Sequence, residues 1–267
     1  YTLDQFETDI AGLQSDPAAP LLNRTVQALY PAGSSLAPFL LAATNGEDLP
    51  NLPSIDTAWI DSLSFPCALP TLPDAGWPVR VTHGCPAAAR ELAGRYTASA
   101  LIDLYQRLGF YSAPGVPLET SANPIPDGST DFTHLALGMQ GVDVSPLQMA
   151  LAAAALSNQG VVPAPRLALS VNTPQAGWVI LPVEGKARPV FTAGEADQAA
   201  AALTVGDQPF WEALGDAPLS DVRSLTWFLG GTPPGWSGTP VVAVVLLETK
   251  APYLAEYIGQ SLIMATQ

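Results

Sequence analysis

LLNRTVQALYPAGSSLAPFLLA, residues Leu21 to Ala42, is the most informative segment of this chain. Its Pro-Ala-Gly sequence indicates a turn, and the two serines that follow suit the start of a helix, with Ser34 or Ser35 as N-cap. Residues three apart on a helix lie on one face within hydrogen-bond reach. Ser34 and Ala37 should therefore meet across one helical turn.

This spacing is typical of an activated serine, but one partner is missing. A serine hydroxyl is a weak nucleophile until a neighbouring base takes its proton. A lysine three residues later would be such a base, whereas Ala37 offers no nitrogen, no charge and no hydrogen bond. The segment therefore predicts a serine without its usual activation.

Composition limits the class of protein. The chain has 267 residues, of which 48% are hydrophobic and 13% charged, as expected for a single well-buried globular domain. The formal net charge of -14, with Lys186 and Lys250 as the two lysines, argues against nucleic acid and anionic lipid as direct partners. Neutral or basic surfaces are the expected partners. The longest apolar run, Met149 to Leu156, is too short to span a membrane, and no signal-peptide pattern opens the chain.

Helical spacing of apolar residues recurs in five segments. These helices are predicted over Leu3 to Leu13, Ser34 to Thr44, Ala87 to Arg107, Ser145 to Asn158, and Pro252 to Ala265. Asn45-Gly46 is a turn signal after the second, Gly109 should end the third, and Pro146 and Gly160 suit the ends of the fourth. In the last helix we expect Leu254, Ile258 and Leu262 to pack on a sheet.

Strands and loops fill the rest. Ser224 to Gly230 and Val241 to Glu248 are rich in Val, Leu, Trp and Phe and are predicted as strands. From Asp48 to Pro86 prolines recur and no period is sustained, which predicts an irregular excursion. This excursion holds Cys67 and Cys85, which would commonly form a disulfide in an oxidising compartment and be two unrelated buried residues in a cytosol.

Four sequence blocks, taken in order, resemble the penicillin-binding protein transpeptidases. The opening segment resembles the family's P-L-x-N-R-A-x-x-x-x-Y-P-P-G-S-T-F-K-P-F. The others are LIDLYQRLGF from Leu101, ALGMQGVDVSPLQMALAAAALSNQG from Ala136, which is similar to G-Q-G-x-L-x-V-T-P-L-Q-x-A, and LTWFLGGTPP from Leu225. PVVAVVLLE then takes the place of the family's last strand. Together the blocks cover nearly the whole chain.

The resemblance implies an α+β fold, a central antiparallel sheet sandwiched by helices plus an all-helical subdomain. We expect one transpeptidase-like domain over 1–267, with the helical subdomain at roughly 34–200 and the sheet strands and C-terminal helix at roughly 205–267. Family members carry two strands and a membrane anchor before this point, so the resemblance implies a fragment lacking them. It also implies an extracytoplasmic location at the bacterial cytoplasmic membrane, and hence a disulfide between Cys67 and Cys85.

The family's second motif, Ser-x-Asn, aligns with Gly84, Cys85 and Pro86. Its side chains relay protons and hold the substrate amide in the family. Glycine and proline cannot accept a proton or donate from a side chain. We therefore expect a turn before a helix here and no catalytic group.

The family's third motif, Lys-Thr-Gly, aligns best with Ala213, Leu214 and Gly215, with an uncertainty of two or three residues. Its lysine attracts the substrate carboxylate, and its backbone helps form the oxyanion hole. No lysine occurs between Lys186 and Lys250. Ala213 is also flanked by two acids, Glu212 and Asp216, which should invert the local field and repel a carboxylate-bearing peptide or β-lactam.

One alternative base is available in the sequence. His83, next to the second motif, could activate Ser34, with an acid such as Asp103 orienting it. A lone histidine in a loop more often serves packing or the surface, and the same holds for His134. No spacing typical of a metal site, a phosphate loop or a nucleotide-binding fingerprint occurs, so no metal or cofactor is expected.

These features predict a catalytically impaired transpeptidase domain that acts as a binding or scaffold module in bacterial cell-wall assembly. Its expected partners are other cell-wall synthesis or division proteins and peptidoglycan, with membrane contact only through a missing N-terminal anchor. Two alternatives stay open. One is a divergent serine acyl-transferase or hydrolase that uses Ser34, and the other is a non-covalent sensor of peptidoglycan or β-lactam.

Overall fold

A three-stranded antiparallel sheet forms the centre of the fold. The computed structural model describes residues 2–44, 49, 57–182, 185–220 and 222–266. The strands are β9 (Trp211–Ser220), β10 (Arg223–Gly231) and β11 (Val242–Leu247), in the spatial order β11-β10-β9. The sequence predicted β10 and β11 to within one residue at each end, and both predictions are confirmed.

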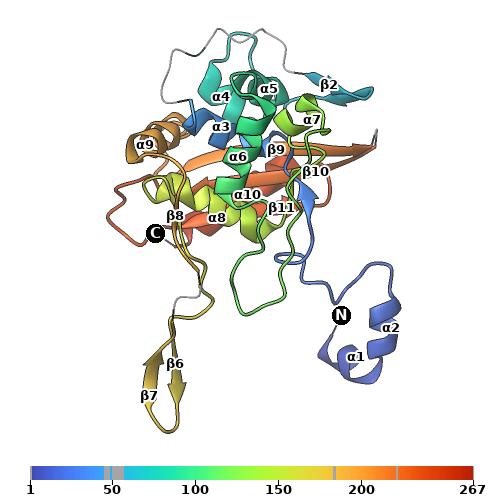
Figure 1. The fold of residues 1–267 in the computed structure, drawn as a ribbon, viewed down its shortest axis with the longest axis vertical. Helices are drawn as coiled ribbons and strands as arrows, with labels where there is room; N and C mark the ends of the chain where they lie inside the picture. The colour runs from blue at the N-terminus through green and yellow to red at the C-terminus, as the bar shows by residue number, and fades with distance from the viewer. Residues whose placement is uncertain (1, 45–48, 50–56, 183–184, 221, 267) are drawn as a thin grey trace.

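Helices cover both faces of this sheet (Figure 1). On one face lies α8 (Pro146–Ser157), and on the other lies α10 (Pro252–Met264). Successive strand side chains point to opposite faces, so Trp227 enters the large core while Phe228 enters a smaller core beneath α10. The predicted α+β fold, an antiparallel sheet between helices, is confirmed.

The ends of α8 follow from its sequence. Ser145 and Gln148 form a capping box, in which the Ser145 hydroxyl accepts from the Gln148 N–H at 3.2 Å and the Ser145 N–H donates to Gln148 Oε1 at 2.9 Å. Pro146 occupies the first turn, where no N–H is needed. Gly160, at a φ of 84°, lies just beyond the helix. This predicted helix is confirmed.

In α10 the prediction that Leu254 and Leu262 pack on the sheet is wrong. Leu254 and Leu262 are each 51% exposed, while Ile258 packs against the smaller core. The buried residues lie one position further along and are Ala255, Gly259 and Ile263. A Cβ at Gly259 would overlap the ring of Phe228. The helix therefore lies so close to the sheet that small residues, not leucines, form the contact.

Five further helices contribute to the large core. They are α3 (Ala37–Ala42), α5 (Pro86–Ala93), α6 (Ala98–Leu108), α7 (Phe132–Ala136) and α9 (Ala193–Ala202). The predicted single helix from Ala87 to Arg107 is wrong, because Thr97 caps a new helix by accepting from the Ala100 N–H at 3.2 Å. Gly109 ends α6 in a left-handed conformation, with a φ of 94°, as predicted.

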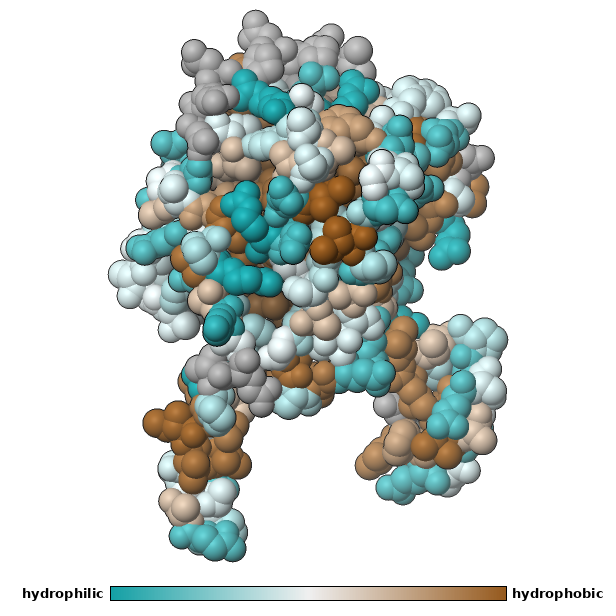
Figure 2. All heavy atoms as spheres, viewed as in Figure 1, coloured by the Kyte–Doolittle hydropathy of each residue, from teal (hydrophilic) through white to brown (hydrophobic). Residues whose placement is uncertain are grey.

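Two segments project from this body in Figure 1. The N-terminal helix predicted over 3–13 is instead two short helices, α1 (Leu3–Thr8) and α2 (Ile10–Ser15), because the Asp9 side chain caps the second. No side chain of either helix is buried. The other projection is a hairpin of β6 (Ser170–Thr173) and β7 (Gly177–Ile180), which forms the apolar patch at the lower left of Figure 2.

The excursion from 48 to 86 is more regular than predicted. Its described part contains a hairpin of β2 (Ala58–Ile60) and β3 (Leu63–Phe65), followed by helix α4 (Trp77–Thr82). A disulfide joins Cys67 to Cys85, as we expected from the resemblance. The predicted turn at Asn45-Gly46 lies outside the described residues. Two short strand pairs complete the fold, β1 (Tyr30–Pro31) with β4 (Asp143–Val144) and β5 (Val161–Val162) with β8 (Arg188–Pro189).

Candidate active site

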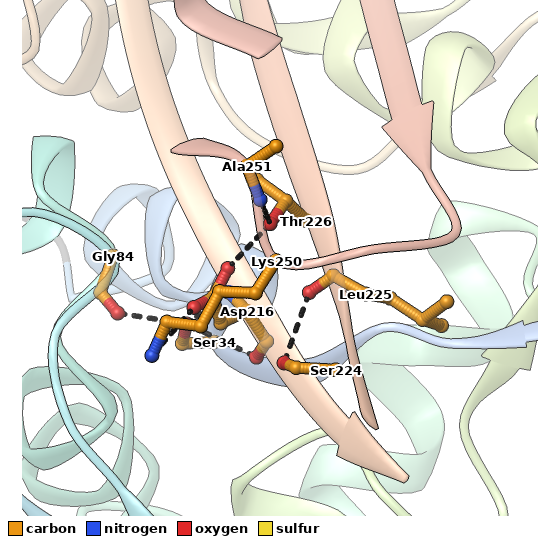
Figure 3. A network of polar contacts seen from close by, with 8 residues as sticks. All are labelled: Ser34, Gly84, Asp216, Ser224, Leu225, Thr226, Lys250 and Ala251. Atoms are coloured by element: carbon orange, nitrogen blue, oxygen red, sulfur yellow. Dashed lines mark hydrogen bonds and ion pairs between the residues drawn. The ribbon is translucent and has the colours of Figure 1, made fainter. Parts of the chain in front are cut away.

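Ser34 lies at the meeting point of three chain segments (Figure 3). Its hydroxyl donates to the carbonyl oxygen of Gly84 at 2.9 Å and accepts from the backbone N–H of Asp216 at 3.0 Å. The residue is 1% exposed. All partners of the hydroxyl within hydrogen-bond distance are backbone atoms, so it functions as a bridge between the segments that carry residues 84 and 216.

The local backbone around Ser34 differs from the predicted helix. Residues Gly33–Leu36 form a short 3-10 helix, η1, and the α-helix begins at Ala37. Neither Ser34 nor Ser35 caps it through a side chain, since the Ser35 hydroxyl instead donates to the Ala32 carbonyl at 2.6 Å. Ala37 is fully buried in the hydrophobic core. No space around it is open to solvent or to a substrate.

The residues aligned with the second motif lie beside Ser34 but offer no side-chain chemistry. Gly84 has a φ of 66°, and a Cβ there would lie 2.8 Å from the carbonyl oxygen of Leu214. Cys85 is buried and bonded to Cys67, and Pro86 is the first residue of α5. The carbonyl oxygen of Gly84 is what this segment contributes to Ser34.

The residues aligned with the third motif lie in β9, on the other side of Ser34. Ala213 and Leu214 are buried, and a Cβ at Gly215 would overlap the backbone of Ser35. This edge of β9 therefore lies directly against η1. The structure thus brings together the three places that the sequence singled out, residues 34, 84–86 and 213–215, and closes the space between them with backbone.

The structure does not join His83 to Ser34. The Nδ1 atom of His83 lies 2.8 Å from the carbonyl oxygen of Pro70, and Asp103 lies exposed on α6 with no contact to this ring among the described hydrogen bonds. His134 pairs instead with Asp61, at 3.0 Å between Nε2 and Oδ2. Neither histidine is within hydrogen-bond distance of the serine.

Asp216 is a site residue whose partners the sequence did not reveal. It is 4% exposed, and its Oδ1 accepts from the hydroxyl of Thr226 at 3.0 Å. The ammonium group of Lys250 lies 3.7 Å from its Oδ2. Burial raises the pKa of the Asp216 carboxyl, while the Thr226 hydrogen bond and the charge of Lys250 oppose this rise.

These contacts correct the prediction that two acids invert the field at the third motif. Lys250 faces the charge of Asp216, and the side-chain amide of Gln260 donates to both oxygens of Glu212, at 2.9 Å and 3.2 Å. Burial raises the pKa of Glu212, which Gln260 opposes. Both carboxyl groups therefore have partners, and a lysine from a distant part of the chain supplies a cation near this strand.

Strand register explains why Lys250 arrives there. Asp216 lies opposite Thr226 in the β9–β10 pair, and Thr226 lies opposite Leu247 in the β10–β11 pair. Lys250 comes just after β11 ends, and so it lies next to Asp216. The contact between Lys250 and Asp216 therefore follows from the pairing of three strands, and no residue spacing near residue 213 indicates it. Among the described residues, no group of three His, Cys, Asp or Glu side chains could hold a metal ion.

Comparison with known proteins identifies the family of this fold. Residues 82–205 match the family model of the penicillin binding protein transpeptidase domain. Residues 82–205 therefore belong to a penicillin-binding protein transpeptidase domain. Its sequence is 29% identical over 232 residues to the peptidoglycan D,D-transpeptidase PbpA of Mycobacterium tuberculosis, covering 80% of this chain and 46% of that protein.

Solved structures share the fold of this transpeptidase domain. The crystal structure of PBPA from Mycobacterium tuberculosis superposes with a TM-score of 0.79 at 21% identity, covering 100% of this chain and 67% of that one. A D,D-transpeptidase domain from Eggerthella lenta gives a TM-score of 0.75 at 18% identity, covering 99% and 73%. The chain spans about half the length of the PbpA relative that it matches.

Proposed function

We propose that this transpeptidase domain does not form an acyl-enzyme and instead acts as a binding or scaffold module in peptidoglycan assembly. The observation that carries the proposal is the state of the Ser34 hydroxyl, which is buried and bonded to backbone groups of residues 84 and 216. A nucleophile must reach a substrate carbonyl and lose its proton to a base, and Ser34 has neither access nor base.

The residues at position 37 and at the second motif support the same conclusion. Position 37 is a buried alanine, and residues 84–86 contribute a glycine, a disulfide-bonded cysteine and a proline. Each catalytic group in such a site contributes orders of magnitude in rate, so the loss of the base alone is close to disabling. By contrast, solved structures of the Mycobacterium tuberculosis relative are acyl-enzyme complexes with imipenem and with penicillin G.

The cellular role is proposed from the family. The relatives are named peptidoglycan D,D-transpeptidases, which motivates a place for this domain in the cell-wall machinery, outside the cytoplasmic membrane. Other cell-wall synthesis or division proteins, and peptidoglycan itself, are the proposed partners. In the part of the chain that the structure describes, no helix is long and apolar enough to cross a membrane.

Acylation is the decisive test. The purified chain is incubated with a fluorescent penicillin beside an active penicillin-binding transpeptidase, and labelling is read on a denaturing gel and by intact mass. We expect no labelling of this chain and full labelling of the active protein. A covalent adduct that disappears in Ser34→Ala would overturn the proposal.

The rival serine hydrolase is tested separately with a panel of small esters. Turnover that disappears in both Ser34→Ala and His83→Ala would establish it and discard the scaffold role. The absence of ester turnover, in a chain that shows a cooperative thermal unfolding transition, supports the proposal, because the chain would then be folded and catalytically inactive.

A further inference from the structure

Two adjoining cavities lie at the base of the β6–β7 hairpin, which projects from the body in Figure 1. Their volumes are about 240 Å³ and about 110 Å³. Gly115 and Pro165 line both of them, so the two cavities lie next to each other. Ser34, Gly84 and Asp216 line neither, and the two cavities are therefore separate from the closed site.

The larger cavity is apolar. It lies between the chain segments that lead into and out of the hairpin, and Leu167 and Leu181 belong to one segment each. Arg166 lies in the first segment and donates to the carbonyl oxygen of Leu181 at 2.6 Å, which joins the two segments. Three more of the lining residues are prolines, namely Pro117, Pro165 and Pro182. Such a lining accommodates an aliphatic chain.

The smaller cavity carries positive charge. Lys186 and Arg188 line it, and Lys186 is exposed with no hydrogen-bond or ion-pair partner among the described residues. Residues 159–191 contain these two cations and Arg166 against one carboxylate, that of Glu184, which lies outside the described residues. None of the other described lining residues of either cavity is charged. With Glu184 counted, positive charge is therefore in excess here, in a chain whose formal net charge is -14.

The guanidinium group of Arg188 is held in place with most of its donors unused. It packs over the backbone of Gly109, where a Cβ would overlap it. Gln148 occupies the backbone acceptors around it, since its side-chain amide donates to three carbonyl oxygens, those of Gly109, Phe110 and Ser112. Among the described residues the Arg188 side chain makes one hydrogen bond, of 3.3 Å to the Ser112 hydroxyl, and its buried Nε has no partner. Buried polar atoms are seldom left unpaired, so this arrangement is typical of a site that a ligand completes.

A cationic cavity beside an apolar one is complementary to a molecule with a carboxylate group at one end and an aliphatic chain at the other. We propose that the two cavities together bind a free aliphatic monocarboxylate. Its carboxylate group lies against Arg188 and Lys186, and its chain lies between Leu167 and Leu181. This inference goes beyond the proposed function, because it requires neither an active nor an inactive Ser34.

Binding is tested with hexanoate as the probe on the full ¹⁵N-labelled chain, with sodium chloride at matched ionic strength as reference. We expect saturable shifts of the Gly109, Gly115 and Leu181 amides. Hexanoate should bind at least about tenfold more tightly than acetate, because its longer chain enters the apolar cavity. Hexanol, which has the chain without the charge, should bind more weakly than hexanoate.

Variants separate the two ends of the site. Arg188→Gln should weaken hexanoate binding by about tenfold, because a charge-assisted bond is lost, and Lys186→Ala should weaken it in the same direction. Arg90→Gln, which removes a charge on α5, should leave it unchanged. Leu167→Ser should weaken the binding of hexanoate but not of acetate, whereas Leu72→Ser, at an exposed leucine elsewhere, should change neither.

Four outcomes would overturn the proposal. They are shifts that do not saturate, equal affinities for hexanoate and acetate, equal affinities for hexanoate and hexanol, and an unchanged hexanoate affinity in Lys186→Ala. Lys186 is exposed and pairs with no described residue, so this variant should fold even if Arg188→Gln does not. Hexanoate binding should persist in Ser34→Ala, and so failure here is distinguishable from failure of the acylation test.

Discussion

The hydroxyl of Ser34 donates a hydrogen bond to the carbonyl oxygen of Gly84, 50 residues away in the chain, over 2.9 Å. The hydroxyl oxygen of Ser34 also accepts a hydrogen bond from the N–H of Asp216, 182 residues away. A side chain that in an acyl-transferase would attack a substrate here holds three distant segments together. The hydroxyl of this serine therefore contributes to the stability of the fold.

Ser34→Ala should destabilise the fold. The substitution leaves a buried carbonyl and a buried N–H without a partner, which costs about 1 to 3 kcal/mol. Urea unfolding measures this loss, with Ser261→Ala on the exposed side of α10 as control. Equal stability of the two variants would show that the buried bonds contribute nothing.

Ala37→Lys should not restore a base. Residue 37 is fully buried in the core, so a lysine there must displace neighbours or bury an unpaired charge, at a cost of about 3 to 5 kcal/mol. We expect a large fall in melting temperature and no penicillin labelling, whereas Ala11→Lys on exposed α2 should melt like the parent. A stable, labelled Ala37→Lys protein would mean that the site is one substitution from activity.

Gly84→Ser, which restores the first residue of the second motif, should also be destabilising. The backbone there has a φ of 66°, and the new Cβ would lie 2.8 Å from the Leu214 oxygen. Left-handed strain and this close contact together cost about 2 to 4 kcal/mol. Gly94→Ser, at an exposed helix end with ordinary φ, is the matched control, and chemical denaturation compares the two. Similar midpoints would contradict the packing described here.

Lys250→Ala should produce a pH-dependent loss of stability. The pKa of Asp216 is raised by burial, so the folded protein binds this proton more tightly than the unfolded chain. Its contribution to the free energy of unfolding is present below about pH 4 and falls as the pH rises through the folded pKa.

Without Lys250 the raised pKa should rise further, and the fall should deepen. We expect a loss of about 1 kcal/mol at pH 8, modest because the lysine is half exposed, and a smaller loss at pH 4. Asp216→Asn in the same background should remove the pH dependence, while Lys186→Ala should have no effect. A pH-independent loss on Lys250→Ala would rule out the ion pair as its cause.

Local signals in the sequence predicted α8, β10 and β11 well. Pro146 and Gly160 indicated the two ends of α8, because each acts through its nearest neighbours. The same reasoning failed where a cap interrupts a continuous apolar period, as at Asp9 and Thr97. Both residues read as ordinary polar positions until the backbone around them is known.

The candidate site was located from the sequence, but its state was not. The order of motifs placed residues 34, 84 and 213–215 together. The alanine at position 37, where the family has a lysine, predicted the lack of a base. Nothing local indicated that Lys250 would reach Asp216, because that contact follows from the register of three strands. Nor could a sequence show that the backbone itself fills the space beside Ser34.

The close contact of Gly259 with Phe228 has a consequence at the other end of α10. This helix begins two residues after Lys250, and the glycine lies about two turns further along. We therefore expect the backbone at Lys250 to move with the helix if the helix changes its depth on the sheet. A methyl group added at residue 259 would overlap the ring of Phe228 and lift the helix. We expect this movement to lengthen the contact between Lys250 and Asp216, so that a position with no charge of its own influences an electrostatic contact.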